Sequence, residues 1–190
     1  MIDPQLAKRI KLVGFDVDGV LTDGSVYLGT AGRHDVELKR FDILDNVGVR
    51  LLRAAGIKVV IVSGRVSPAT TIRGRELEVE AVVQDDMAQK LEPFQEILNR
   101  FGIAWEEAAF VGDDLPDMAV LRRVGLPVGV ANATQEIRAV VSHLTAASGG
   151  YGAVREFCES LLKARGEWDD LVQQYLMERE PTSTGERRGT

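Results

Sequence analysis

Cysteine is almost absent from this sequence of 190 residues, which contains Cys158 alone. A single cysteine cannot form an internal disulfide, so the sequence does not belong to the class of small secreted domains that disulfides hold together. This composition is typical of a reducing compartment, and we expect the cytoplasm. Histidine is scarce too, and the distant His34 and His143 do not form a metal-binding pattern.

Long apolar runs and an excess of positive charge are also absent. No stretch approaches the roughly 18 apolar residues of a membrane-spanning helix, and residues 1–11 have no signal-peptide core, so we expect no membrane partner. The 23 Lys and Arg residues against 29 Asp and Glu residues give a net charge of −6. Such a chain does not attract a phosphate backbone, so we expect no nucleic-acid partner, and an anionic ligand would need a local positive site.

The composition is otherwise that of an ordinary globular protein, with 45% hydrophobic and 27% charged residues. Short apolar runs rich in β-branched residues alternate with segments of helical spacing. This alternation predicts an α/β fold, a doubly wound parallel sheet with helices on both faces. The strands are expected at 10–15, 57–62, 81–83, 108–111 and 126–130, and the helices between them at 46–55, 68–76, 90–101, 115–124 and 134–141.

Residues 1–165 are expected to form one domain without a separate cap. Within it, residues 25–41 contain two alternating runs around a glycine turn, which predict a β-hairpin flap beside the first strand. Residues 166–180 predict a C-terminal helical extension. Residues 181–190 lack apolar anchors and predict a disordered tail.

Charged and polar side chains follow three of the predicted strands. Asp16 and Asp18 come after the first strand, Ser63 and Arg65 after the second, and Asp113 after the fourth. Ligands of an open α/β sheet bind beyond the carboxyl ends of the strands, so we expect these side chains to share one site. Crowded carboxylates repel one another unless a cation lies between them, and a small set of oxygen ligands favours Mg²⁺. The combination predicts a magnesium-dependent site for a phosphate group.

The same residues predict a two-step phosphatase. Asp16, the first residue after the strand, can accept a phosphoryl group as an aspartyl-phosphate. Asp18 can protonate the leaving oxygen and later deprotonate the attacking water, while its backbone carbonyl faces the metal. Ser63 can hold a phosphoryl oxygen, and Lys90 can neutralise both the phosphoryl group and the nucleophile.

These motifs resemble those of the haloacid dehalogenase superfamily of phosphotransferases. The motifs occur in the order that the superfamily shows. They are Asp-Val-Asp-Gly-Val-Leu-Thr at 16–22, a serine, a lysine and Gly-Asp-Asp-Leu-Pro-Asp at 112–117. The flap, Ser-Gly-Arg at 63–65 and Gly-Gly-Tyr-Gly-Ala-Val-Arg-Glu at 149–156 are similar to its capless group, the 3-deoxy-D-manno-octulosonate 8-phosphate (KDO 8-phosphate) phosphatases. The resemblance covers residues 8–165.

The resemblance implies a homotetramer with bound Mg²⁺ that hydrolyses KDO 8-phosphate in lipopolysaccharide synthesis. It implies that Asp16, Asp18 and Asp113 hold the metal, and that Asp18 is both the acid/base and a substrate contact. The remaining substrate contacts that it implies are Arg50, Arg65, Arg73 and Lys90.

Several of these residues have a plainer alternative. Arg50 and Arg73 lie on predicted helices, where an exposed arginine is the default, and Lys90 can be a solvated helix residue. Asp114 and Asp117 can be helix caps, although Asp117 could equally hold a metal-bound water.

Two departures from the family pattern affect the predicted substrate. Asp42 stands where the family has a residue like asparagine, and Asp45-Asn46 replaces Asp-Gly, so the sugar-acid loop carries an extra carboxylate. Residues 84–90 are one residue longer than the family's spacing to its lysine and lack its glycine. The alternatives are therefore a phosphatase of another sugar acid, such as a nonulosonate 9-phosphate, and a non-catalytic assembly or regulatory subunit.

The flap also predicts how the site is closed. An isolated two-stranded hairpin is marginal in water, so it needs a surface to pack against. We expect the flaps of several chains to pair, burying Tyr27 and Leu28 and placing a wall beside a neighbour's Asp16. The helix expected at 167–177 could then reach a neighbour's site.

Overall fold

The structure is a computed structural model that describes residues 1–180. Six parallel strands form one sheet in the order β5-β4-β1-β6-β7-β8. From the central β1 the chain moves out through β4 to β5, then returns to β6 on the other side of β1. This reversal places a crevice beyond the carboxyl ends of β1, β4 and β6. The strands are β1 (Leu12–Phe15), β4 (Lys58–Ser63), β5 (Ala81–Gln84), β6 (Ala108–Gly112), β7 (Leu126–Gly129) and β8 (His143–Leu144).

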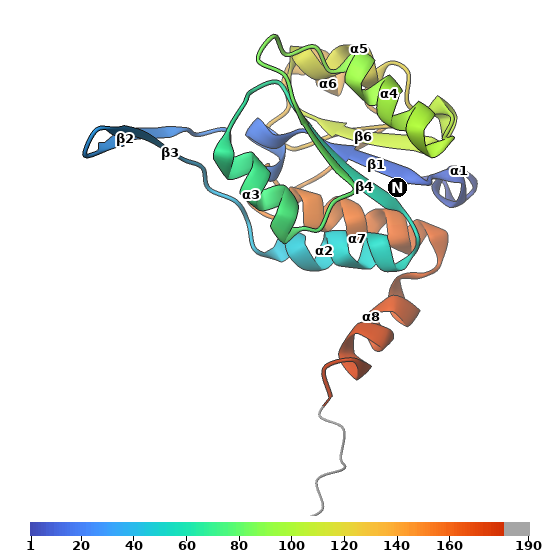
Figure 1. Cartoon of the computed structure of the whole chain (residues 1–190). Helices are drawn as coiled ribbons and strands as arrows, with labels where there is room; N and C mark the ends of the chain where they lie inside the picture. Colours follow the sequence, from blue (N-terminus) through green and yellow to red (C-terminus); the bar gives the residue numbers. More distant parts are fainter. Residues whose placement is uncertain (181–190) are drawn as a thin grey trace, which may run out of the picture.

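Helices cover both faces of this sheet, which confirms the predicted doubly wound α/β fold. α2 and α7 lie on one face, and α4 and α5 lie on the other (Figure 1). On the first face the ring of Phe15 meets that of Phe157 at 6.2 Å, and on the second Phe110 meets Phe94 at 5.3 Å, both edge to face. The helices are α1 (Pro4–Arg9), α2 (Leu44–Ala54), α3 (Pro68–Glu76), α4 (Leu91–Phe101), α5 (Met118–Leu121), α6 (Gln135–Arg138), α7 (Ala153–Arg165) and α8 (Trp168–Met177), and the short helical turns are η1 (Val17–Leu21), η2 (Trp105–Glu107) and η3 (Leu115–Asp117).

The predicted elements match most of these bounds, with four differences. The helix predicted at 134–141 is only the single turn of α6 at Gln135–Arg138. The helix predicted at 115–124 is only η3 followed by the single turn of α5, because the chain must return to β7 at Leu126. Gly125 sits so close to the Glu106 carbonyl oxygen that a Cβ there would lie 2.3 Å from it. The other two differences are the short α1 and the two-residue β8, which the sequence analysis did not predict.

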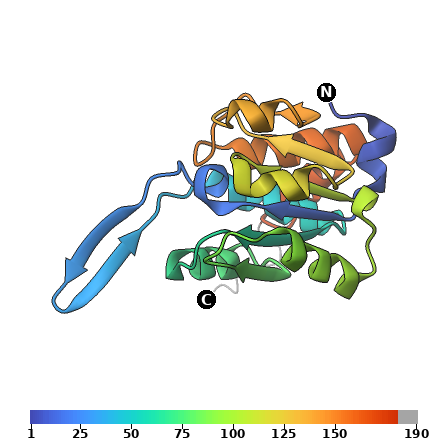
Figure 2. The same cartoon turned by 90° about the horizontal axis from the view of Figure 1, so that it is seen from above.

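The predicted flap is a separate two-stranded antiparallel sheet of β2 (Tyr27–Ala31) and β3 (His34–Leu38). It extends away from the body of the molecule (Figure 2). Its apolar side chains are exposed, Tyr27 to 56% and Leu28 to 76%. No cap domain accompanies it among residues 1–180.

The C-terminal region contains α8, whose partly buried side chains, including Leu171 and Tyr175, pack against the core. The predicted disordered tail, 181–190, lies outside the described residues. Within residues 1–180, no helix combines the length and the apolar character that a membrane crossing requires. Cys158 is buried in α7, as expected of a core residue.

Candidate active site

The loop after β1 brings the first two aspartates to the crevice. Asp16 has extended backbone dihedral angles and leads into η1, where Gly19 adopts a φ of 93°. A Cβ on Gly19 would lie 2.1 Å from Asp113 Oδ2, so only glycine lets this loop fold against the end of β6. The Thr22 hydroxyl closes the turn, accepting the Gly19 backbone N–H at 3.3 Å and donating to the Val17 carbonyl at 3.2 Å.

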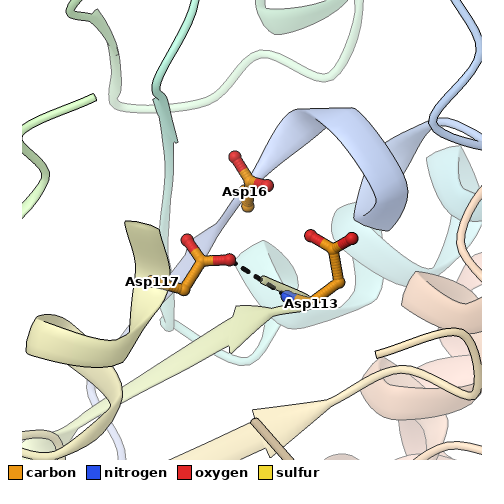
Figure 3. A group of neighbouring side chains, drawn as sticks. All are labelled: Asp16, Asp113 and Asp117. Atoms are coloured by element: carbon orange, nitrogen blue, oxygen red, sulfur yellow. Dashed lines mark hydrogen bonds between the residues drawn. The ribbon is translucent and has the colours of Figure 1, made fainter. Parts of the chain in front are cut away.

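Three carboxylates converge at this place. Asp16, Asp113 and Asp117 each offer one oxygen, and the three oxygens lie within 4.8 Å of one another (Figure 3). Asp117 is fixed by its Oδ2, which accepts the backbone N–H of Asp113 at 3.0 Å (Figure 3). The buried Oδ1 of Asp113 accepts no hydrogen bond. The cluster therefore contains at least one oxygen with free capacity for a ligand.

Lys90 lies directly before α4 and supplies the cluster's positive charge. Its ammonium lies 2.6 Å from Asp16 Oδ1 and 2.6 Å from Asp117 Oδ1, and the residue is only 4% exposed. Burial alone would lower the pKa of Lys90, but the two carboxylates outweigh it and raise that pKa. Lys90 is therefore a charged lysine inside the site, and not a solvated helix residue.

One ammonium does not balance three carboxylates. Burial, together with the charge of Asp117, raises the pKa of Asp16 above its usual range and that of Asp113 to about 7. Oxygen ligands of this kind suit Mg²⁺, whose charge would relieve the repulsion. The donor set fits a divalent cation, with Asp16 and Asp113 placed to hold it. Asp117 already binds Lys90 and a backbone N–H.

Asp18 and the loop after β4 complete the site. The Asp18 carboxylate lines the same cavity outside the cluster of three and binds the ammonium of Lys39, which lies 2.8 Å from one of its oxygens and 2.9 Å from the other. Ser63 is buried at the end of β4, and its hydroxyl donates to the Arg65 carbonyl at 3.0 Å. The Arg65 guanidinium binds Glu37 of the flap at 2.7 Å.

A cavity of about 330 Å³ unites these groups at the predicted edge of the sheet. The structure thus brings Asp16, Asp18, Arg65 and Asp113 together with Lys90, whereas the predicted Ser63 is not among the cavity residues, although its neighbour Gly64 is. The cavity is lined by Asp16, Asp18, Gly24, Gly64, Arg65, Ala88, Lys90, Asp113, Asp114, Pro116 and Asp117.

Arg50 and Arg73 do not join this cavity. Arg50 lies on an exposed face of α2, where its guanidinium binds Glu178, the residue after α8, at 3.0 Å. The Arg73 guanidinium is buried and donates to Glu76 at 2.9 Å and to the Asp42 carbonyl at 2.6 Å. The geometry of their own chain gives no support to their predicted substrate contacts, which stay predictions.

Three features of the site were not predicted. Lys39 had no motif to mark it, although its place at the root of the flap was a possible signal. Asn132 had no signal, yet its side chain joins two loops, donating to the Gly19 carbonyl at 2.9 Å and accepting the Gly149 N–H at 2.7 Å. Asp117, considered as either a cap or a metal group, is also the second partner of Lys90. Asp114 is an exposed cap that accepts the Leu115 N–H at 2.8 Å.

Comparison with known proteins shows which family the chain belongs to. Residues 45–125 match the family model of haloacid dehalogenase-like hydrolases. The chain is 40% identical over 170 residues to the 3-deoxy-D-manno-octulosonate 8-phosphate phosphatase KdsC of Escherichia coli, covering 90% of this chain and 88% of that protein.

Solved structures agree. A probable YrbI family phosphatase from Pseudomonas syringae is 41% identical with a TM-score of 0.85, covering 91% of this chain and 96% of that one. The KDO 8-phosphate phosphatase of Moraxella catarrhalis, solved with magnesium, phosphate and KDO, is 36% identical with a TM-score of 0.85, covering 90% of this chain and 97% of that one. The chain therefore belongs to the KDO 8-phosphate phosphatase family of haloacid dehalogenase-like hydrolases.

Proposed function

We propose that this protein is a Mg²⁺-dependent phosphatase that hydrolyses KDO 8-phosphate to KDO and phosphate in lipopolysaccharide biosynthesis. The observation that carries the proposal is the buried contact of Asp16 with Lys90 at 2.6 Å, at the edge of a cavity that also contains Asp18 and Asp113. The relative from Escherichia coli with that activity in its name is 40% identical over 90% of this chain. The Moraxella catarrhalis enzyme binds magnesium, phosphate and KDO.

The first step transfers the phosphoryl group to the protein. A carboxylate oxygen of Asp16 forms a bond to phosphorus, the bond from phosphorus to the sugar oxygen breaks, and Asp18 gives that oxygen a proton. Lys90 contacts Asp16 and stabilises the negative charge that gathers on the phosphoryl oxygens. When held by Asp16, Asp113 and the Asp18 carbonyl, Mg²⁺ would neutralise the carboxylates and polarise the phosphoryl group.

The second step restores Asp16. Asp18 takes a proton from a water molecule whose oxygen forms a bond to phosphorus, and the bond between Asp16 and phosphorus breaks. Ser63 is proposed to hold a phosphoryl oxygen, because its hydroxyl lies at the end of β4 next to the cavity-lining Gly64. Arg65, at the cavity edge and 47% exposed, is proposed to bind the anionic part of the sugar acid.

The two departures from the family pattern leave this cavity intact. The extra carboxylate of Asp42 accepts the Leu44 N–H at 2.9 Å just before α2, and Asp42 is not among the cavity residues. In the longer stretch before Lys90, the backbone turns at Ala88, which adopts a left-handed conformation with a φ of 56°. Lys90 still reaches Asp16, so neither departure favours another substrate over KDO 8-phosphate.

We further propose that the protein works as a homotetramer in the cytoplasm, with residues 1–165 as the phosphatase domain and residues 166–180 as its extension. The exposed apolar side chains of the flap support pairing between copies, since neither Tyr27 nor Leu28 packs against the core formed by residues 1–180. Paired flaps would exclude water from the cavity of a neighbouring chain.

A substrate panel tests the proposed function. With Mg²⁺ we expect kcat/KM to be highest for KDO 8-phosphate, lower for a nonulosonate 9-phosphate and lowest for p-nitrophenyl phosphate, and a chelator should abolish all three. Arg65→Ala should lower kcat/KM for the sugar acids more than for the aryl ester, whereas Arg100→Ala, on the exposed surface of α4 and outside the cavity, is the matched control. A preference for the nonulosonate ester would reassign the substrate, and no hydrolysis of any ester would refute the phosphatase.

A further inference from the structure

A buried lysine lies beneath the active site, where the flap joins the domain. The Lys39 side chain is 0% exposed although its backbone is at the surface, and it follows directly after β3. Its ammonium lies 2.8 Å from Asp18 Oδ1 and 2.9 Å from Asp18 Oδ2. A buried ammonium is stable only beside an anionic partner, so Lys39 and Asp18 depend on each other.

This contact decides how the Asp18 carboxylate is oriented. Across residues 1–180, no side chain other than Lys39 donates a hydrogen bond to it. A carboxylate otherwise turns easily about its last torsion, because that torsion has a broad energy minimum. An ammonium in contact with both oxygens fixes the plane of the group. Asp18 is 29% exposed on its other side, where it borders the cavity.

Lys39 is itself fixed by the root of the flap. Glu37 of β3 lies 3.8 Å from the Lys39 ammonium and binds the Arg65 guanidinium at 2.7 Å. The neighbouring Ser67 hydroxyl and the Arg65 guanidinium lower the pKa of Glu37. The flap root is therefore tied to η1 through Lys39 and to the loop after β4 through Glu37.

We propose that Lys39 is a positioning residue that holds the Asp18 carboxylate toward the water that attacks phosphorylated Asp16. In that step Asp18 accepts a proton from the water, the water oxygen bonds to phosphorus, and the bond to Asp16 breaks. Lys39 keeps its proton and its covalent state throughout. The inference rests on the proposed phosphatase chemistry, and it assigns to the flap root a part in the second step.

The test separates the two steps by rapid quenching with p-nitrophenyl phosphate and Mg²⁺, since this ester needs no proton donor to release its stable leaving group. Lys39→Met should slow the breakdown of the phosphorylated enzyme on the order of 10²-fold, as expected for a misplaced catalytic group, and slow its formation far less. The phosphorylated enzyme then accumulates. Lys39→Gln retains an uncharged amide NH2 donor and should lose less.

Lys58→Met is the matched control, because Lys58 lies at the opposite end of the sheet with its ammonium 4.6 Å from the Phe101 ring centre. Both of its rate constants should equal those of the wild type. Adding Lys39→Met to Asp18→Asn should slow breakdown little further, since residues that act as a unit lose activity non-additively.

The proposal is overturned if the Lys39 variants slow formation and breakdown equally, or if they slow neither step. It is also overturned if the loss of rate in the double variant is the full product of the two single losses. If Lys39→Met does not fold, the comparison of the formation and breakdown rate constants is made with Lys39→Gln instead. Wild-type protein that hydrolyses p-nitrophenyl phosphate but not KDO 8-phosphate refutes the proposed substrate and leaves this test in force. A wild type that hydrolyses neither refutes both proposals.

Discussion

The Lys90 ammonium contacts Asp16 and Asp117 at equal distances of 2.6 Å, while Asp113 forms no salt bridge with any of residues 1–180. The raised pKa of Asp113, about 7, follows from burial and from the charge of Asp117. Asp113 is thus the carboxylate whose charge a bound metal would relieve most. This difference between neighbouring aspartates gives a test of the metal site that does not depend on turnover.

Asp113→Asn should abolish stabilisation of the fold by Mg²⁺. A ligand that binds only the folded protein, at a concentration of 100 times its Kd, stabilises it by about 2.7 kcal/mol, so the wild-type Tm should rise when Mg²⁺ replaces a chelator. Thermal unfolding with each additive measures the shift, with the exposed cap variant Asp114→Asn as control. An undiminished Mg²⁺ shift in Asp113→Asn would remove Asp113 from the metal site.

Asp45 gives a second test, of stability against pH. It is buried in α2, one oxygen accepts the Arg155 N–H at 3.0 Å, and the other has no partner. Burial raises its pKa from 3.8 to about 7. The folded chain therefore binds this proton more tightly than the unfolded chain, and the resulting stability is present below about pH 4 and is lost as the pH rises to about 7.

Asp45→Asn should accordingly increase the free energy of unfolding at about pH 8 by up to ~4 kcal/mol, and change it far less at about pH 4. Denaturant unfolding at the two pH values measures this difference. Asp170→Asn, on exposed α8, should change neither value. A variant that loses as much stability at the higher pH as at the lower would show that the Asp45 carboxylate is ionised and satisfied in the fold.

Among the elements, the flap has the least support from its own chain. Its strands pair only with each other, and Tyr27, Leu28 and Leu38 are more than half exposed. A two-stranded hairpin of this kind is marginally stable alone. The proposed tetramer would bury these side chains, so the flap links oligomeric state to activity.

Leu28→Glu should break the proposed assembly, because a charge cannot be buried in an apolar contact without a partner. Light scattering should give the mass of a tetramer for the wild type and a smaller mass for the variant, with reduced activity. Leu144→Glu, on the edge strand β8 of the main sheet, is the control. A fully active monomeric wild type would contradict the shared site.

The extent to which the elements were predictable follows from their length. Periodicity located α4, which was predicted at 90–101 and spans Leu91–Phe101, because an amphipathic run of this length carries a repeated signal. β8 spans only residues 143–144, which is too short for any period, and α1 has only six residues. The helix predicted at 115–124 was too long, because the chain has to turn back to β7 at Leu126. The local sequence pattern does not show where this turn must occur.

The sequence predicted those site residues whose place is determined by the position of the backbone. Asp16, Asp18 and Asp113 lie at carboxyl ends of adjacent parallel strands, so topology alone brings them together. Arg50 and Lys39 were not predictable, because their ammonium or guanidinium groups lie several bonds from the backbone. Each is directed by a carboxylate that is distant in sequence, Glu178 for Arg50 and Asp18 for Lys39.

For the whole molecule, a net charge of −6 has to be reconciled with an anionic substrate. The fold resolves this locally, because the strand order places Lys90 and Arg65 at one edge beside the carboxylates that fit a metal. Lys90 and Arg65 therefore supply a local positive site at the reversal point of the sheet, although acidic residues outnumber basic ones in the chain. The central claim is that Asp16 uses this edge to take the phosphoryl group from KDO 8-phosphate.

A single-turnover reaction of KDO 8-phosphate with excess enzyme and Mg²⁺, comparing the wild type with Asp16→Asn, tests that claim most directly. An amide of the same shape cannot attack phosphorus, so the account predicts a phosphorylated Asp16 in the quenched wild type and no phosphate release by a folded Asp16→Asn variant. More than a trace of phosphate release by that variant, or a phosphoryl group on another residue, would contradict it.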